Sequence, residues 1–230
     1  MGYTGDDGLI LIGGGGHALA VAEAAAMSGR PIRGFLDDDE NAALGSLDGI
    51  LSAPGAPPVE VNRLGALSAL GSLDEFGRCE IILAIGDIKA RRRLIDTLGQ
   101  SGIARGVKIA TIIHPRAVVS PSAVIEPGVY IGPGAIIHTR AHIGAHAIVN
   151  SGAIVEHECD IGDNTHVAPA AAMGGRVTIG EDVLVGIGSR ILPNLTIGKK
   201  STIGAGAAVI RNVGGLETVV GVPVRRRLSD

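Results

Sequence analysis

Residues 131–167 read IGPGAIIHTRAHIGAHAIVNSGAIVEHECDIGDNTHV, and an aliphatic residue returns at every sixth position of this stretch. The same period extends in both directions, from Ile113 to Val209. Its members are Ile113, Val119, Ile125, Ile131, Ile137, Ile143, Val149, Val155, Ile161, Val167, Met173, Ile179, Val185, Ile191, Ile197, Ile203 and Val209. A period of six fits neither an α-helix nor a simple alternating strand. It indicates a β-solenoid of hexapeptide repeats, in which each repeat is a short strand followed by a turn.

The period also predicts how the repeats stack. If three hexads close one triangular coil, residues about 18 apart lie above one another, so Ile131, Val149, Val167, Val185 and Ile203 form one internal ladder. A second series, four residues after each aliphatic one, is mostly small. Such a narrow interior excludes rings, which agrees with 2% aromatic residues and no Trp. The 36 glycines among 230 residues suit turns that need a positive φ.

Composition excludes several classes of protein. The net charge of -3 argues against a general nucleic-acid binder, and no run of 18 apolar residues is present to span a membrane. Residues 1–8 are polar and acidic and do not resemble a signal peptide. The two cysteines, Cys79 and Cys159, have neither a disulfide framework nor a metal-ligand spacing. We expect a cytoplasmic protein that binds no metal.

The N-terminal region has the pattern of a nucleotide-binding fold. Residues 9–12 read as a buried parallel strand, and a glycine run from Gly13 to Gly16 then leads into an Ala-rich helix. The pattern G-x-G-x-x-A lets the backbone approach a phosphate at a helix N-terminus. A second strand, residues 32–36, ends in Asp37, Asp38 and Asp39, at about the ~20-residue spacing of a ribose-binding acid. A nicotinamide cofactor and a purely structural glycine turn are alternatives, but the 110 residues before the hexads suit half a dinucleotide, such as a nucleotide-sugar.

The remainder of this region is less regular. Residues 39–77 contain a Pro-rich loop at 53–58 and an expected short helix at 64–73. A third strand, residues 80–85, runs into Gly86 and a basic helix whose first turn includes Arg91, a position suited to an anionic ligand. A last strand, residues 107–113, precedes the hexads. We therefore predict two domains, residues 1–110 and 111–230.

Exceptions to so regular a repeat mark candidate functional residues. His157 is flanked by Glu156 and Glu158 where other hexads carry Gly, Pro or Ala, and an adjacent carboxylate can fix the tautomer of a histidine base. The other solenoid histidines read individually as surface residues. Cys159 falls on the inward series and is expected to be buried and inert. Paired glycines, Gly174 and Gly175, either admit an extended ligand or form a tight turn.

The combination of GGGGHA, FLDDD, AIGD, VEHECDIG, LPNLTIG and GVPVRRR along the chain resembles one branch of the left-handed β-helix acyltransferases. That branch contains the bacterial nucleotide-linked 4-amino-sugar N-acetyltransferases of bacillosamine and perosamine synthesis and the related sialic acid O-acetyltransferases. The resemblance implies a Rossmann-like α/β domain followed by a left-handed parallel β-helix. It also implies a homotrimer, with acetyl-CoA in a groove between neighbouring copies and active sites at subunit interfaces.

Roles follow from this resemblance residue by residue. His157 matches the general base on the sugar amine, and Glu158 matches the acid that orients it. Positions near the nucleotide-sugar are Gly15, His17, Asp37, Asp38, Gly86 and Arg91. Positions near the pantetheine and acetyl thioester are His166, Gly174, Gly175, Ile187, Gly188 and Gly206. The run Arg225 to Arg227 is either a contact for the CoA phosphates or a solvated tail.

The leading hypothesis is therefore acetyl-CoA-dependent N-acetylation of a nucleotide-linked 4-amino-4,6-dideoxysugar by direct transfer. O-acetylation of sialic acid or another sugar is the alternative within the family. A non-catalytic β-helix scaffold with a nucleotide-sensing domain is an alternative of another class, and His157 with Glu158 argues against it. A nicotinamide oxidoreductase is the remaining, weakest alternative. The identity of the nucleotide, the sugar and the glycan pathway stays open at this point.

Overall fold

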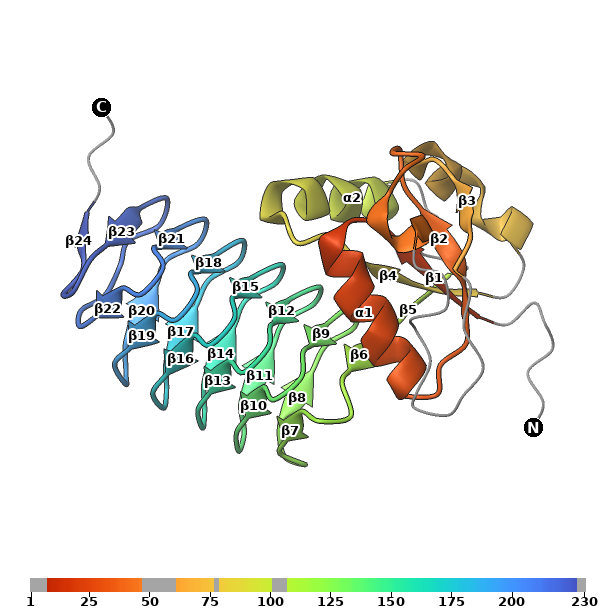
Figure 1. Ribbon diagram of the computed structural model, residues 1–230. Helices are drawn as coiled ribbons and strands as arrows, with labels where there is room; N and C mark the ends of the chain where they lie inside the picture. The colour runs from red at the N-terminus through yellow and green to blue at the C-terminus, as the bar shows by residue number, and fades with distance from the viewer. Residues whose placement is uncertain (1–7, 47–60, 77–78, 101–106, 227–230) are drawn as a thin grey trace. The chain divides into compact units, whose positions relative to one another are not determined.

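The computed structural model describes residues 8–46, 61–76, 79–100 and 107–226, which form two compact units, residues 1–115 and 116–230 (Figure 1). Each unit has its own hydrophobic core.

The N-terminal unit is a parallel sheet with helices. Its elements are β1 (Gly8–Ile12), α1 (Gly16–Met27), β2 (Ile32–Leu36), the 3-10 helix η1 (Ala43–Ser46), β3 (Arg63–Gly65), the 3-10 helix η2 (Leu67–Phe76), β4 (Cys79–Leu83), α2 (Ile88–Gln100), β5 (Lys108–Ile109) and β6 (Ile112–Ile113). The strand order in the sheet is β3-β2-β1-β4-β5, and all of its pairs are parallel. The aliphatic residues of β1 are buried, as expected for a central parallel strand. This confirms the Rossmann-like α/β fold.

Two local expectations for this unit differ from the structure. The short helix expected at 64–73 is present as the 3-10 helix η2, but it begins only at Leu67, because residues 63–65 pair with the edge of β2 and extend the sheet. The single strand expected at 107–113 is two short strands, β5 and β6. The pairing of β5 with β4 ends where the Ala110 amide donates a hydrogen bond to the Ile81 carbonyl. The next carbonyl, that of Thr111, accepts a hydrogen bond from Arg30 Nη1. The loop expected at 53–58 lies outside the described residues.

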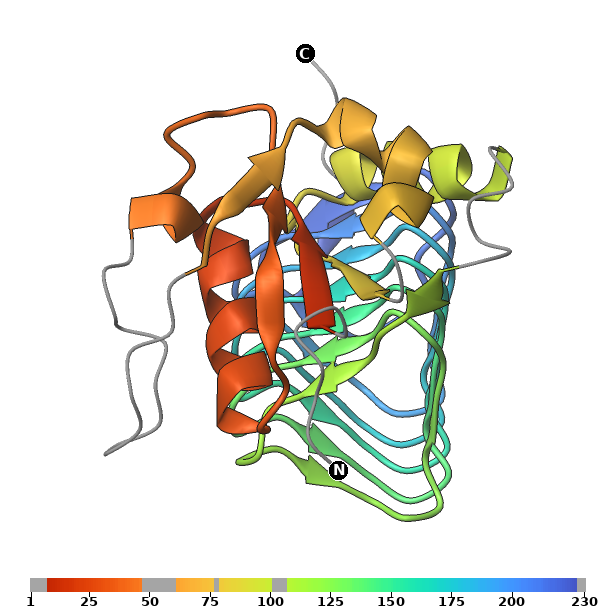
Figure 2. The same ribbon diagram turned by 90° about the vertical axis from the view of Figure 1, so that its right-hand side faces the viewer.

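The second unit is a prism of two-residue strands in three parallel sheets (Figure 2). The first face consists of β7 (Val118–Val119), β10 (Ile136–Ile137), β13 (Ile154–Val155), β16 (Ala172–Met173), β19 (Arg190–Ile191) and β22 (Ala208–Val209). The second face consists of β8 (Val124–Ile125), β11 (His142–Ile143), β14 (Asp160–Ile161), β17 (Thr178–Ile179) and β20 (Thr196–Ile197). The third face includes β9 (Tyr130–Ile131), β12 (Ile148–Val149), β15 (His166–Val167), β18 (Leu184–Val185) and β21 (Thr202–Ile203).

The register of the strands confirms the predicted ladder. Val149 pairs with Ile131 on one side and Val167 on the other, and Val185 joins Val167 to Ile203. From β9 to β22 the second residue of every strand is buried. The predicted first member of the series departs from this rule, since Ile113 is 36% exposed and its neighbour Ile112 is buried. Val119 and Ile125 are partly buried against the solenoid core, which does not include Ile113, so the inward pattern begins one hexad later, at Val119.

The turns explain why the chain is rich in Gly. One residue of most turns has a left-handed φ of 55–81°, including nine non-glycine residues between Arg140 and Lys200. We call the turns at 138–140, 156–158, 174–176 and 192–194, which lead from the first face to the second, the histidine edge. The turns from the third face to the first form the glycine edge, whose left-handed residues are Gly134, Gly152, Ala170, Gly188 and Gly206.

The solenoid ends in a small hairpin. β23 (Thr218–Val220) continues the third face beside β21, and β24 (Arg225–Arg226) pairs with it in antiparallel fashion. Arg225 and Arg226 are exposed, and Arg227 lies outside the described residues. Within the ranges that the structure describes, no helix has the length and apolar character needed to cross a membrane.

Candidate active site

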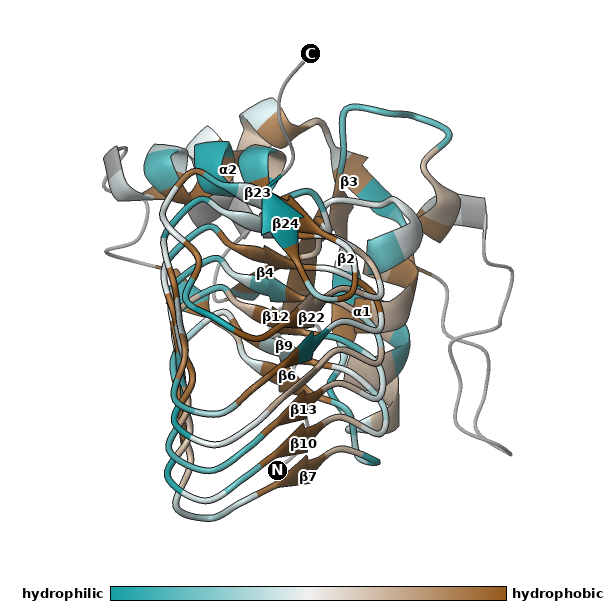
Figure 3. Ribbon diagram, turned by 90° about the vertical axis from the view of Figure 1, so that its left-hand side faces the viewer, coloured by the Kyte–Doolittle hydropathy of each residue, from teal (hydrophilic) through white to brown (hydrophobic). Residues whose placement is uncertain are grey.

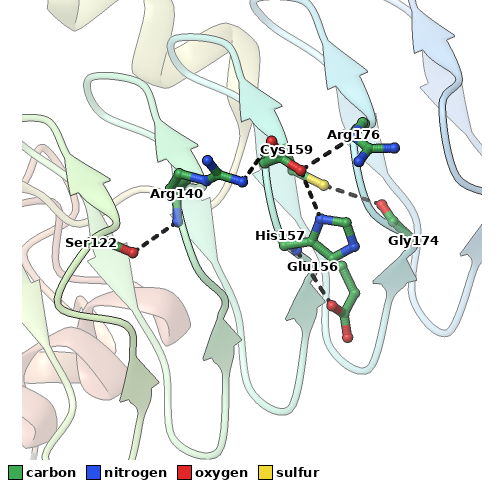
Figure 4. A network of polar contacts seen from close by, with 8 residues as sticks. Ser122, Arg140, Glu156, His157, Cys159, Gly174 and Arg176 are labelled. Carbon is green, nitrogen blue, oxygen red and sulfur yellow. Dashed lines mark hydrogen bonds and ion pairs between the residues drawn. The ribbon is translucent and has the colours of Figure 1, made fainter.

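The histidine edge carries the residues expected to be catalytic. His157 and Glu158 form the turn between β13 and β14, and Glu158 takes the left-handed position with φ 59°. His157 Nδ1 lies 3.1 Å from Glu158 Oε2 (Figure 4). With Nδ1–H donating to this carboxylate, Nε2 becomes the ring atom that accepts a proton. This arrangement is that of a general base with its orienting acid.

Two arginines flank the carboxylate of Glu158. Arg140 Nη2 lies 2.9 Å from Oε1, and Arg176 Nε lies 3.2 Å from Oε2. The hydrogen bond with His157 is the largest cause of a lowered pKa of Glu158; desolvation opposes it, and the guanidinium groups of Arg140 and Arg176 add to the lowering. Glu158 is therefore anionic at neutral pH and suited to stabilise an imidazolium.

Gly174 and Gly175 lie one coil beyond His157 on the same edge. A Cβ on Gly175 would come within 2.4 Å of His157 Nε2, and a Cβ on Gly174 would come within 2.6 Å of the Pro193 ring. The thiol of Cys159 donates to the Gly174 carbonyl over 3.2 Å. Burial raises the pKa of this thiol, in keeping with its expected inertness. The paired glycines thus make room for the imidazole and for Pro193.

The other predicted acetyl-CoA residues lie elsewhere on the prism. Ile187, Gly188 and Gly206 are on the glycine edge, where the Gly206 amide donates to the Ile187 carbonyl over 2.7 Å. The Ile187 side chain is 60% exposed, and no atom within 4 Å would obstruct a Cβ on Gly188 or Gly206. His166 begins β15 on the third face, with Nε2 3.3 Å from Asn150 Nδ2. Within one copy, these residues and His157 lie on different sides of the solenoid.

In the N-terminal unit the glycine run and the acidic cluster meet. The Gly14 amide donates to Asp37 Oδ2 over 2.6 Å, and the Asp39 amide donates to Asp37 Oδ1 over 2.8 Å. Gly14 is closely packed, because a Cβ there would lie 2.5 Å from the Phe35 ring. Gly15 is exposed, with nothing near its Cβ position, and it begins α1 without a side-chain cap. Asp37 therefore shapes the turn that presents the helix N-terminus.

The remaining predicted substrate residues have more varied surroundings. Asp38 Oδ1 accepts the Leu67 amide over 2.9 Å. His17 lies beside Gly86, whose Cβ position is 3.6 Å from the Cβ of His17. Arg91 is only 1% exposed, and its Nη1 donates to the carbonyls of Ile85 and Gly86 over 2.7 and 3.3 Å. These contacts make Arg91 a support of the β4–α2 turn.

Sequence reasoning missed Arg140 and Arg176 as members of the site. Each lies 18 residues from Glu158, one coil before and one coil after it. The coil length of three hexads places equivalent turn positions above one another, so it could have indicated that these three residues are neighbours, though not that their side chains pair.

Comparisons with known proteins agree with this architecture. The model of the PglD N-terminal domain matches residues 8–98, and that of the bacterial transferase hexapeptide (six repeats) matches residues 176–211. A mutant of perosamine N-acetyltransferase from Caulobacter crescentus, solved in complex with CoA and GDP-perosamine, is 33% identical, with a TM-score of 0.82 over 96% of this chain and 97% of that one. The chain belongs to the family of bacterial sugar N-acetyltransferases.

A second acetyltransferase structure is similarly close. The acetyltransferase domain of PglB from Neisseria gonorrhoeae, in complex with acetyl coenzyme A, is 32% identical, with a TM-score of 0.80 over 96% of this chain and 99% of that one. WeeI from Acinetobacter baumannii, at 23% identity and a TM-score of 0.72 over 96% of this chain and 100% of that one, shares the fold. No curated protein sequence matches the chain. The family, the left-handed β-helix fold and the enzyme class predicted from sequence are confirmed, and the assignment of individual site residues stays a prediction.

Proposed function

We propose that this sugar N-acetyltransferase transfers the acetyl group of acetyl-CoA to the 4-amino group of a nucleotide-linked 4-amino-4,6-dideoxysugar. The contact between His157 Nδ1 and Glu158 Oε2 carries the proposal, because it gives the histidine edge a base with a defined orientation. The similar perosamine enzyme has been solved with CoA and GDP-perosamine, and the PglB domain with acetyl coenzyme A. The perosamine enzyme is an N-acetyltransferase, which favours an amine over a hydroxyl as the acceptor.

His157 Nε2 removes the proton of the sugar amine as nitrogen attacks the thioester carbonyl. Glu158 stabilises the positive charge that the imidazole then holds. The C–S bond breaks as the amide forms, and the imidazolium returns its proton to the CoA sulfur. Cys159, just after the turn of His157, is buried and hydrogen-bonded to a carbonyl, so direct transfer is favoured over an acyl-cysteine.

The nucleotide-sugar is assigned to the N-terminal unit and acetyl transfer to the solenoid, as the predicted domains 1–110 and 111–230 suggest. The α1 N-terminus presents backbone amides at Gly15 and Gly16 that suit a phosphate. Asp37 holds this turn in shape through Gly14. His17 in the first turn of α1, and Asp38 and Gly86 on the neighbouring loops, would meet the ligand directly, whereas the buried Arg91 would act by holding the β4–α2 turn.

The outer surface of the first face supports a homotrimer. The outward residues of this face form an apolar column, broken only by Arg190, of Val118, Ile136, Ile154, Ala172 and Ala208. Val118 is 62% exposed, and Figure 3 shows the strands β7, β10 and β13 in the brown of apolar residues. The first face lies between the histidine edge and the glycine edge. If copies join into a ring through the first face, the histidine edge of one copy meets the glycine edge of the next. His157 of one copy then lies near the open glycines of its neighbour, which suit pantetheine.

The test is release of free thiol from acetyl-CoA with a panel of UDP-, TDP- and GDP-linked 4-amino-sugars and free sialic acid. We expect one amino-sugar to be turned over, and His157→Ala to reduce kcat by roughly 10²–10⁴-fold, the typical contribution of a positioned base. His142→Ala is the matched control, because His142 is also paired with a carboxylate, Asp160, but lies on the second face.

Each outcome of this assay is decisive. Turnover of sialic acid alone would replace the amine by a hydroxyl as acceptor. Full activity of the His157→Ala variant would show that His157 is not the general base. If the wild type turned over none of the acceptors, the proposed substrate class would be wrong.

A further inference from the structure

We propose that Arg140 and Arg176 are positioning residues of the acetyl transfer, which hold the Glu158 carboxylate so that Oε2 faces Nδ1 of His157. The role presupposes the proposed function, in which His157 is the base. Neither arginine contacts the imidazole in the described contacts, so both would act through Glu158 (Figure 4).

The solenoid places the three charges in register. Arg140, Glu158 and Arg176 occupy the same left-handed turn position in successive coils, with φ values of 55°, 59° and 57°. Backbone bonds fix the spacing of these coils, from the Glu158 amide to the Thr139 carbonyl over 3.0 Å and from the Arg176 amide to the His157 carbonyl over 2.9 Å. The Arg140 amide in turn donates to Ser122 Oγ, one coil earlier. The order positive, negative, positive is thus fixed by the fold.

Each oxygen of the carboxylate has its own cation. Oε1 accepts from Arg140 over 2.9 Å, while Oε2 accepts from Arg176 over 3.2 Å and lies 3.1 Å from His157 Nδ1. Charge-assisted bonds to both oxygens oppose rotation of the carboxylate, which would otherwise turn Oε2 away from the ring. The clamp therefore maintains the tautomer in which Nε2 accepts the proton.

Neither the turn nor stability requires arginine at these positions. The glycine edge makes equivalent turns with Gly or Ala, residues that carry no charge. The side chains of Arg140 and Arg176 are 68% and 62% exposed, and exposed ion pairs contribute little to stability. Both arginines contact Glu158, and Glu158 in turn contacts His157.

The experiment is a double-mutant cycle on acetyl transfer. Arg140→Met, Arg176→Met and the double variant are made in the wild type and in Glu158→Gln, and kcat and KM for both substrates are measured. We expect kcat to fall about 10-fold for each single variant and about 10²-fold for the double, within the range of a positioned base, with unchanged KM. In Glu158→Gln the arginine substitutions should have no further effect, because the group they hold is gone. Arg→Lys should restore part of the loss.

Lys200→Met is the matched control. Lys200 is an exposed cation at a left-handed turn position, with φ 58°, but in a turn from the second face to the third. Its removal should leave kcat unchanged. The clamp would be overturned if the fold-losses in kcat of the Arg variants and of Glu158→Gln multiplied, or if the Arg substitutions raised KM for acetyl-CoA. Either result would indicate that the arginines bind an anionic ligand directly.

A measurement without turnover separates this proposal from the proposed function. The ¹⁵N shifts of the His157 imidazole should report Nδ1–H in the wild type and a mixture of tautomers in Arg140→Met/Arg176→Met. An unchanged tautomer would overturn the clamp even if His157 proves to be the base. A changed tautomer would support it even if the acceptor is not an amino-sugar.

Discussion

Gly175 shows how a residue without a side chain can control the proposed base. A Cβ at this position would lie 2.4 Å from Nε2 and 2.5 Å from Cε1 of His157, so Gly175→Ala must displace the imidazole. Since a shift of about 1 Å at the reacting groups can cost on the order of 10²-fold, we expect kcat to fall by about that factor. Steady-state kinetics with acetyl-CoA is the measurement.

Gly152→Ala is the control for this substitution. Its Cβ position is open, and Ala170 occupies the same left-handed position one coil later, with φ 57°. A rise in KM for acetyl-CoA at constant kcat in Gly175→Ala would contradict the packing role and indicate that a ligand uses the space.

Residue-level reasoning from sequence was strongest for the interior and weakest for the turns. The inward positions of Val149 and Val167 follow from a six-residue period that runs along the solenoid without interruption. The surroundings of Arg91 do not follow, because the same basic first turn suits an exposed ligand contact and a buried support of a loop. Likewise, the pairing of Arg140 with Glu158 depends on the direction of long side chains across coils, which local sequence does not specify.

At the scale of elements, stacked strands bring charges together across three coils. His142 of β11 lies between Asp160 of β14 and Glu126, with Nδ1 2.8 Å from Asp160 Oδ1 and Nε2 3.5 Å from Glu126 Oε1. The hydrogen bond to Asp160 is the largest cause of a raised pKa of His142, and the charges of both carboxylates and the bond to Glu126 act in the same direction. The protonated form therefore stabilises the second face.

The sign of the resulting pH dependence follows from the raised pKa. Stabilisation by His142 is fully present below the unfolded-state pKa of about 6.5 and is lost as pH rises through the higher folded-state pKa. We expect His142→Asn to lower Tm by roughly 1–2 °C at acidic pH, as for an exposed ion pair, and by less in alkaline solution. Thermal unfolding from pH 5.5 to 9 measures this difference, and Asp160→Asn should show the same trend. A gap that stays constant with pH would contradict the ion-pair interpretation.

Edges of sheets were less predictable than repeats. β3 was missed because its three residues gain their strand conformation from pairing with β2, a tertiary effect without a local signal. The solenoid strands are equally short, but each is defined by its place in a period. The fold of the second unit was therefore predictable coil by coil, and that of the N-terminal unit only in its order of strands and helices.

At the scale of the whole molecule, the separation of the predicted groups on one copy argues for a shared site. His157 lies on the histidine edge, and Gly188 and Gly206 lie on the glycine edge, with the apolar first face between them. In a closed ring each interface joins one edge of a copy to the opposite edge of the next. In the proposed homotrimer, a complete site would therefore require two copies, one supplying His157 and the other the open glycines.

Mixing two inactive variants tests this arrangement. His157→Ala removes the base, and Gly188→Leu fills the open position on the glycine edge. No atom lies within 4 Å of this Cβ position, and Ala170 shows that a residue with a side chain can take the left-handed φ of this turn. The two variants are unfolded together in equal amounts and refolded as a mixture. About a quarter of the wild-type activity should return, because that share of the interfaces in random trimers has an intact histidine edge on one copy and an intact glycine edge on the next. Light scattering would verify that each parent and the mixture have the mass of a trimer. If the site belonged to one copy, no combination would contain an intact site and the mixture would stay inactive, so recovery distinguishes a site between copies from one within each.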